Sequence, residues 1–150
     1  MKKPLLKIVT MLLVAAFSFG AFVAQAADKD KSFASTKIVL QISDPNPFKQ
    51  TLVLNVANNL VKAYGEDDVD VEIVAFGPGL RLLMEGNANK NRIAGLASQG
   101  VRFSACENTI KNFSKKLGSA PKIDGHAKLV KAGVVQIVDL VKKGYILVKP

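Results

Sequence analysis

The sequence of 150 residues contains no tryptophan, one cysteine and one histidine, and these shortages exclude several kinds of protein. A chain with a single thiol cannot form an internal disulfide, so its fold must be stabilised by a hydrophobic core. One cysteine and one histidine also offer too few soft ligands for a zinc site, and we expect no metal. Cys106 is therefore left as a buried thiol, a bridge between two copies or a reactive group.

Aromatic residues suited to stacking on nucleotide bases are scarce, since only Tyr64 and Tyr145 accompany phenylalanines that mostly fall on apolar faces. The formal net charge is +9, but the lysines are scattered, and a pair such as Lys142-Lys143 stands where a helix is expected to end. There it complements the partial negative charge of the helix carboxyl terminus. Nucleic-acid binding favours a concentrated basic patch with interleaved aromatics, so we expect no nucleic-acid partner.

Motifs that bind nucleotides or present a catalytic serine are also missing from the sequence. No G-x-x-x-x-G-K-[ST] phosphate loop occurs, and the segment Gly77-Pro78-Gly79 has Leu82 where a dinucleotide fingerprint would carry its third glycine. No G-x-S-x-G turn presents a serine nucleophile. His126 lies near Asp124, and lone histidines are usually loop or core residues. We therefore expect no cofactor.

The N-terminal segment has the pattern of a secretory signal peptide. Three lysines precede an apolar run from Ile8 to Phe17, and Ala24-Gln25-Ala26 supplies the small-x-small arrangement that signal peptidase accepts. We predict a cleavable signal peptide at 1–26, a flexible leader at 27–36 and one domain at 37–150. Cleavage would lower the formal charge from +9 to +6. An uncleaved anchor is the alternative, but the run is shorter than the ~20 residues that span a bilayer, and we expect no membrane association after cleavage.

Beyond the leader, short apolar runs alternate with amphipathic stretches, which is typical of strand-helix repetition around a mainly parallel sheet. Strands are expected at Ile38–Ile42 and at Val69–Phe76, whose nearly continuous apolar run indicates burial on both faces. Three more are expected at Val101–Ala105, Ala127–Val130 and Tyr145–Val148. The sequence thus predicts an α/β fold with a mainly parallel five-stranded sheet.

The segments between these strands carry the apolar period of helices. The clearest helix is expected to begin at Pro47, where Asn46 can cap it, and to end at Tyr64, before Gly65. The other helices are expected at Leu80–Met84, Ile93–Ala97, Thr109–Leu117 and Val134–Val141.

Cys106 directly follows the expected third strand, at the edge where parallel α/β sheets collect ligands and catalytic groups. The loops Asp44–Pro47 and Gly77–Leu80 end at the same edge. Backbone N–H groups and the dipole of the following helix can lower the pKa of a thiol there, although the neighbouring Glu107 opposes this effect. An inert, buried cysteine that packs as a small hydrophobe is an equally weighted alternative.

Three segments together resemble the DsrE/DsrF-like family. They are the cysteine segment Gly100–Thr109 (GVRFSACENT), the turn Val74–Leu80 (VAFGPGL) and the pattern NxxNNL at Asn55–Leu60. The ending Gly144–Pro150 also resembles exported, stand-alone members, and the likeness covers residues 37–150. The resemblance implies a three-layer α/β/α sandwich that forms homo-oligomers and, for an exported member, a periplasmic location.

In the better understood members of that family, a cysteine at the end of a central strand accepts sulfane sulfur as a persulfide and passes it on. The resemblance gives this role to Cys106 and makes Asn108, Thr109, Gly77 and Gly79 its ligand-binding neighbours. The partner would be a small sulfur donor or a protein thiol. Those members act in the cytoplasm with partner subunits, whereas this chain carries an export signal. The alternative is a non-catalytic oligomeric binding module in which Cys106 is structural.

Overall fold

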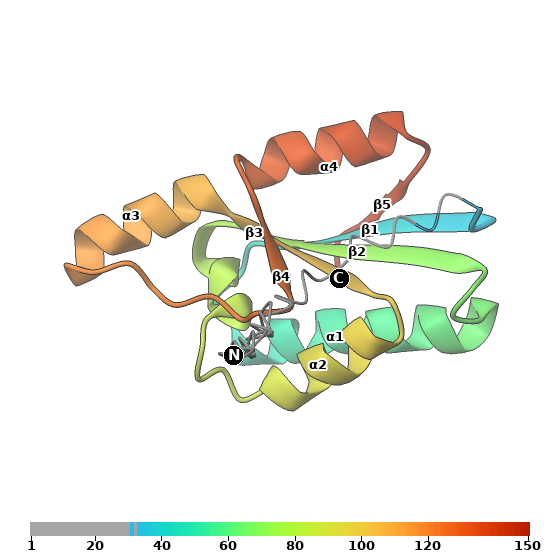
Figure 1. Cartoon of the computed structure of the whole chain (residues 1–150), viewed down its shortest axis with the longest axis horizontal. Helices are drawn as coiled ribbons and strands as arrows, with labels where there is room; N and C mark the ends of the chain where they lie inside the picture. The colour runs from blue at the N-terminus through green and yellow to red at the C-terminus, as the bar shows by residue number, and fades with distance from the viewer. Residues whose placement is uncertain (1–30, 32) are drawn as a thin grey trace, which may run out of the picture.

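The computed structural model of the protein describes residue 31 and residues 33–150. The predicted signal peptide lies outside the described residues, as does much of the predicted leader. Strands and helices alternate along the described chain (Figure 1). In chain order they are β1 (Thr36–Ile42), α1 (Pro47–Tyr64), β2 (Val69–Ala75), the 3-10 helix η1 (Gly77–Leu83), α2 (Lys90–Ser98), β3 (Arg102–Cys106), α3 (Glu107–Leu117), β4 (Ala127–Val130), α4 (Gly133–Lys142) and β5 (Ile146–Val148).

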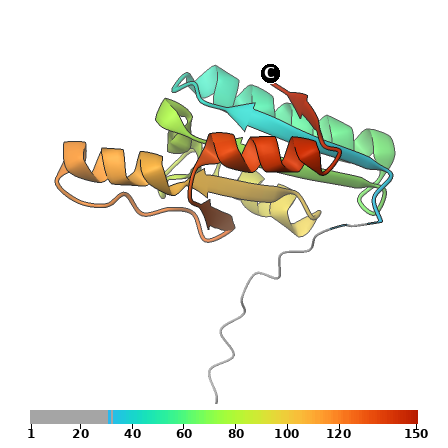
Figure 2. The same ribbon diagram turned by 90° about the horizontal axis from the view of Figure 1, so that it is seen from above.

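The five strands of the described chain form one parallel sheet in the order β4-β3-β2-β1-β5. Figure 1 shows α1 and α2 below the sheet and α4 above it, while α3 projects beyond the end of β3. Figure 2, a view from above, shows α4 lying over the middle of the sheet, with β4 to one side of it. The predicted α/β fold is confirmed, with helices on both faces of a sheet that is parallel throughout.

The predicted start and end of α1 are confirmed by its capping bonds. The Asn46 side chain accepts a hydrogen bond from the backbone N–H of Phe48 at 2.9 Å, and Pro47 takes the first position of the helix. At the other end, the N–H of Gly65 donates to the carbonyl of Val61 at 2.9 Å. The buried face of this helix is formed by Gln50, Val53, Leu54, Ala57 and Val61.

Two apolar cores flank the sheet. The larger core lies between the sheet and the helices α1 and α2, and it includes Leu40, Leu54, Ile73, Leu96 and Phe103. The smaller core lies under α4 and consists of Val39, Val74, Ile137, Leu140 and Tyr145, with Phe76 packed against it. Strand β2 therefore contributes apolar residues to both cores, as its sequence predicts.

The short helix expected at Leu80–Met84 forms earlier and with tighter geometry. It is the 3-10 helix η1, which starts at Gly77, where a φ of 53° suits a glycine and Pro78 favours a helical start. Met84 lies outside this helix and pairs with Ile123 in an isolated antiparallel bridge. The turn after β2 thus leads into helix at once, which keeps its backbone close to the end of the sheet.

Candidate functional site

Cys106 is the last residue of β3 and the residue that precedes α3, so it lies at the carboxyl edge of the sheet as expected. It forms no disulfide, and only 5% of the residue is exposed. Its neighbour across the sheet is Val130 of β4, and α4 begins three residues later at Gly133. The amino ends of two helices, α3 and α4, therefore meet at this cysteine.

Polar groups of both helices shift the pKa of the Cys106 thiol. Burial by itself raises the pKa of the thiol, but the Thr109 side chain and the backbone N–H groups of Gly133, Thr109 and Asn108 lower it. The balance places the pKa below the ordinary value of 9.0. Donors near a sulfur stabilise its negative charge, so these groups favour the thiolate more than burial alone would allow.

The Thr109 hydroxyl is held in place from the turn that follows β2. Its oxygen accepts a hydrogen bond from the backbone N–H of Gly77 at 2.9 Å, and the threonine side chain is buried. Because that oxygen already accepts from Gly77, its own proton is available to the sulfur of Cys106. Gly77 adopts a left-handed conformation, and its N–H donates to the Thr109 hydroxyl. This one hydroxyl thus lies between the glycine turn and Cys106.

The structure brings together most of the site residues expected from the sequence, but in different roles. Gly77 donates to the Thr109 hydroxyl, and the Thr109 side chain lowers the pKa of the Cys106 thiol. Asn108 contributes its backbone N–H, whereas the residue itself is exposed. Gly79 is buried against β1, where a Cβ would lie 2.5 Å from the carbonyl oxygen of Ile42.

The packing of Gly79 predicts a loss of stability when a side chain is added. Gly79→Ala should lower the free energy of unfolding by about 1–3 kcal/mol, because the new methyl group meets rigid backbone. Urea denaturation measures the effect. The matched control is Gly95→Ala in α2, where nothing lies within 4 Å of the new methyl group and alanine is the better helix former. Equal stabilities of the two variants would contradict the close packing.

Gly133 is a neighbour of Cys106 that the sequence did not single out. Its backbone N–H lowers the pKa of the Cys106 thiol, and a Cβ at this position would lie 2.9 Å from the Cβ of Phe76. The absence of a side chain lets the first turn of α4 approach β2 closely. The available signal was a glycine at the start of the helix that follows β4, the neighbour of the cysteine-bearing strand.

A second missed feature is a group of buried charges on the face of the sheet that α4 covers. Asp70 and Glu72 of β2 are almost fully buried, and both pair with Arg102 of β3, at 2.9 Å and 2.8 Å. Ser104 and Gln136 each donate to Glu72 at 2.7 Å. Burial lowers the pKa of Arg102, but the two carboxylates reverse this effect and raise it. The signal was the alternation of acids and apolar residues in VDVEIVA, which places both carboxylates on one face.

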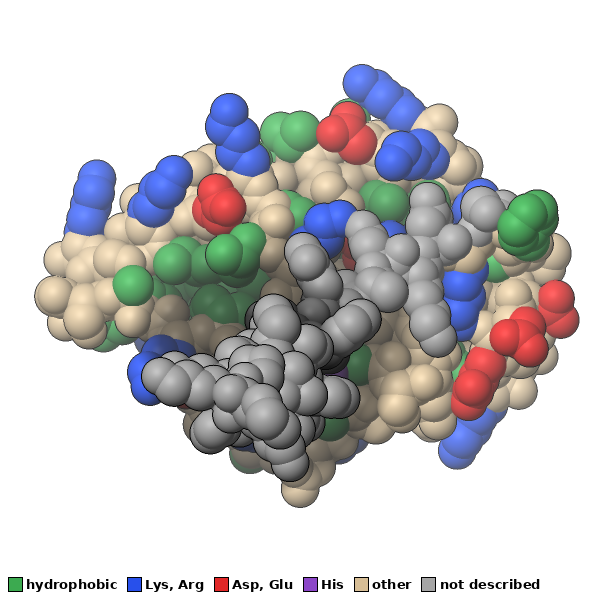
Figure 3. All heavy atoms as spheres, in the orientation of Figure 1, with side chains coloured by type: hydrophobic (Ala, Val, Ile, Leu, Met, Phe, Trp, Pro, Cys, Tyr) green, Lys and Arg blue, Asp and Glu red, His purple; other side chains and the backbone are tan. Residues whose placement is uncertain are grey.

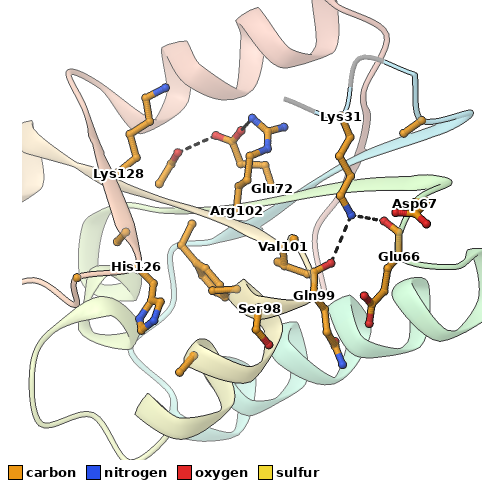
Figure 4. A pocket seen from close by; sticks show the side chains of 18 of the residues that line it. Lys31, Glu66, Asp67, Glu72, Ser98, Gln99, Val101, Arg102, His126 and Lys128 are labelled. Carbon is orange, nitrogen blue, oxygen red and sulfur yellow. Dashed lines mark hydrogen bonds and ion pairs between the residues drawn. The ribbon is translucent and has the colours of Figure 1, made fainter. Parts of the chain in front are cut away.

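A hollow of about 1100 Å³ lies beside these charges, toward the amino ends of β3 and β4. Figure 4 shows Glu72 and Arg102 pointing toward one another on one side of it, and His126 lying apart from them. The His126 ring nitrogen pairs with Asp124 at 2.8 Å within its own loop, as a loop histidine would. Cys106 does not line this hollow.

The sequence led us to expect scattered basic side chains and no metal site. Figure 3 shows lysine and arginine side chains dispersed over the visible face and interrupted by acidic ones. Among the described residues, no three His, Cys, Asp or Glu side chains are grouped as metal ligands would be. Within the same residues, no helix combines the length and apolar character needed to cross a membrane.

Comparisons with known proteins show likeness of fold. A protein of unknown function from Methanobacterium thermoautotrophicum, MTH1491, matches with a TM-score of 0.68 at 25% sequence identity, over 77% of this chain and 99% of its own. A second, BT1422 from Bacteroides thetaiotaomicron, also of unknown function, matches with a TM-score of 0.51 at 15% identity, over 76% and 94% of the two chains. Neither a family model nor a curated protein matches the sequence.

Proposed function

We propose that this protein is a sulfur carrier that holds sulfane sulfur as a persulfide on Cys106. In the loading step, the Cys106 thiolate attacks the outer sulfur of a donor persulfide or polysulfide. A new S–S bond forms, the donor S–S bond breaks, and its electron pair leaves with the donor thiolate. In the delivery step, an acceptor thiolate attacks the outer sulfur on Cys106 and releases the Cys106 thiolate again. The two steps involve no net oxidation and need no cofactor.

The observation that carries this proposal is the position of Cys106 at the amino ends of α3 and α4, where the Thr109 side chain and the backbone N–H groups of both helices lower the pKa of its thiol. A carrier needs its cysteine as a thiolate twice, as the nucleophile when it is loaded and as the leaving group when it delivers. Donors that stabilise the thiolate assist both steps. From the predicted signal peptide we expect the carrier to work in the periplasm. Its partner would be a small sulfur compound or a protein thiol.

The second candidate function is a binding module in which Cys106 is only packed, and the low exposure of the cysteine favours it. The two functions differ in the accessibility of the thiol. A carrier thiol reacts with a small alkylating reagent in the folded protein, at a rate that rises with pH and has its midpoint below the ordinary thiol pKa of 9.0. A packed thiol reacts only after the protein is unfolded by denaturant.

The direct test is the intact mass of the purified protein after incubation with polysulfide or with thiosulfate. We expect polysulfide to add one sulfur, about 32 mass units, which dithiothreitol removes. Cys106→Ser should show no addition. The carrier function is wrong if wild-type protein gains no sulfur from polysulfide, or if the serine variant gains as much. The reaction with thiosulfate identifies the class of donor, because transfer of its outer sulfur to Cys106 releases sulfite rather than a thiolate.

A further inference from the structure

Helix α4 is apolar on nearly all of its sides. Gly133, Ile137 and Leu140 are buried against the sheet. Four valines of the same helix remain 45–59% exposed, namely Val134, Val135, Val138 and Val141. A helix that is apolar on all sides is normally buried on all sides. Valine has a low helix propensity because its side chain is branched, so helix formation does not explain why four valines occur here. We therefore expect part of this surface to be covered by another protein chain.

Three of the exposed valines share one flank of α4. Val134, Val138 and Val141 follow the i, i+4, i+7 spacing of a single helix side. Gln136 marks the opposite flank, where it donates to Glu72 of β2. The three valines thus point toward β1 and β5, where Leu147 of the edge strand β5 is 45% exposed on the same face of the sheet. We call Val134, Val138, Val141 and Leu147 the valine flank.

We propose that a second copy of this chain docks on the valine flank. The alternating spacing of four and three residues is the spacing by which two helices pack side by side. The three valines are also distributed nearly evenly about Val138, so an antiparallel copy of α4 presents the same surface, as a two-fold interface requires. No charged residue belongs to the flank, so self-pairing brings no like charges together at its centre.

The shape of the surroundings favours a protein partner over a small ligand. None of the four residues lines the hollow near Arg102 or the smaller one beside Asp44. A standard interface buries about 800 Å² on each partner around an apolar centre with a polar rim. The valine flank supplies such a centre. Among the described residues β5 is an edge strand of the sheet, so its outer edge continues this surface at one end.

The first test is the mass of the protein in solution, measured by size-exclusion chromatography with light scattering on protein produced from the full-length chain. We expect wild type to be a dimer, or a larger assembly of dimers. Val138→Glu should halve that mass, because it places two carboxylates opposite each other at the two-fold axis. Val135→Glu is the matched control, since Val135 is 54% exposed on α4 but outside the flank. It should keep the mass of wild type.

Three results would overturn the proposal: a monomeric wild type, an unchanged mass for Val138→Glu, or an equal loss of mass for a folded Val135→Glu. A cross-link covers the case in which Val138→Glu does not fold. Cys106 is the only native cysteine, so Val138→Cys in a Cys106→Ser background carries one thiol near the proposed axis. Mild oxidation should convert most of it to a disulfide-linked dimer, and Val135→Cys in the same background should stay mostly unlinked. Equal yields from both would place the interface elsewhere.

Discussion

Replacing Arg102 with leucine is expected to lower the free energy of unfolding by about 3–5 kcal/mol, the usual effect of removing one partner of a buried ion pair. Arg102 is the cation shared by two carboxylates that are almost fully buried, Asp70 and Glu72. Without it, the hydrogen bonds from Tyr145 to Asp70 and from Ser104 and Gln136 to Glu72 remain, but the cation that both carboxylates share is gone. Urea denaturation followed by circular dichroism measures the loss.

Two further variants separate the charge effect from the loss of packing. Adding Asp70→Asn and Glu72→Gln to Arg102→Leu removes both carboxylate charges and should restore a substantial part of the lost stability, because the amides keep most of the shape. Arg92→Leu is a surface control, since Arg92 bonds to Asn55 in an exposed contact, and it should cost less than about 0.5 kcal/mol. A triple variant as unstable as Arg102→Leu would show that the unpaired charges are not the cause.

The fold was largely predictable because its signals are local and repeated. Helix α1 shows this well: a capping asparagine, a proline at the first position and a glycine after the end each act within a few residues. The boundaries of β3 and β5 shifted by one residue, and η1 formed in place of the expected helix, because tertiary contacts decide where an element ends. The strand order was not predicted, because neighbouring strands are chosen by packing between distant segments.

The site was predictable in part, for the same physical reason. The position of Cys106 at a strand end follows from the pattern around one strand, whereas the hydrogen bond between Gly77 and Thr109 joins two segments that are distant in the sequence. The contribution of Gly133 depends on β4 lying next to β3 and on α4 returning over the sheet, which no local pattern encodes. The pairing of Arg102 with Asp70 and Glu72 depends likewise on the register of β2 and β3.

Replacing Thr109 with valine is expected to slow the alkylation of Cys106 near pH 7 by about tenfold, because a hydrogen bond to a charged group, worth about 1.5 kcal/mol, is lost. Valine keeps the shape of threonine but has no hydroxyl to donate to the sulfur. The loss also removes the acceptor for the Gly77 N–H, which now bonds to the Thr109 oxygen at 2.9 Å. The measurement is the rate of reaction with iodoacetamide as a function of pH, on folded protein.

The pH profile distinguishes an electrostatic role of Thr109 from a structural one. In wild type the pKa of Cys106 lies below its ordinary value of 9.0, so the free energy of unfolding should rise with pH between the two values and level off above 9.0. In Thr109→Val the midpoint of the alkylation profile should move to higher pH and the rise in stability should shrink. Thr109→Ser retains the hydroxyl and should keep a midpoint close to that of wild type. If valine changes the plateau rate but leaves the midpoint in place, Thr109 only shapes access to the sulfur and does not set its charge.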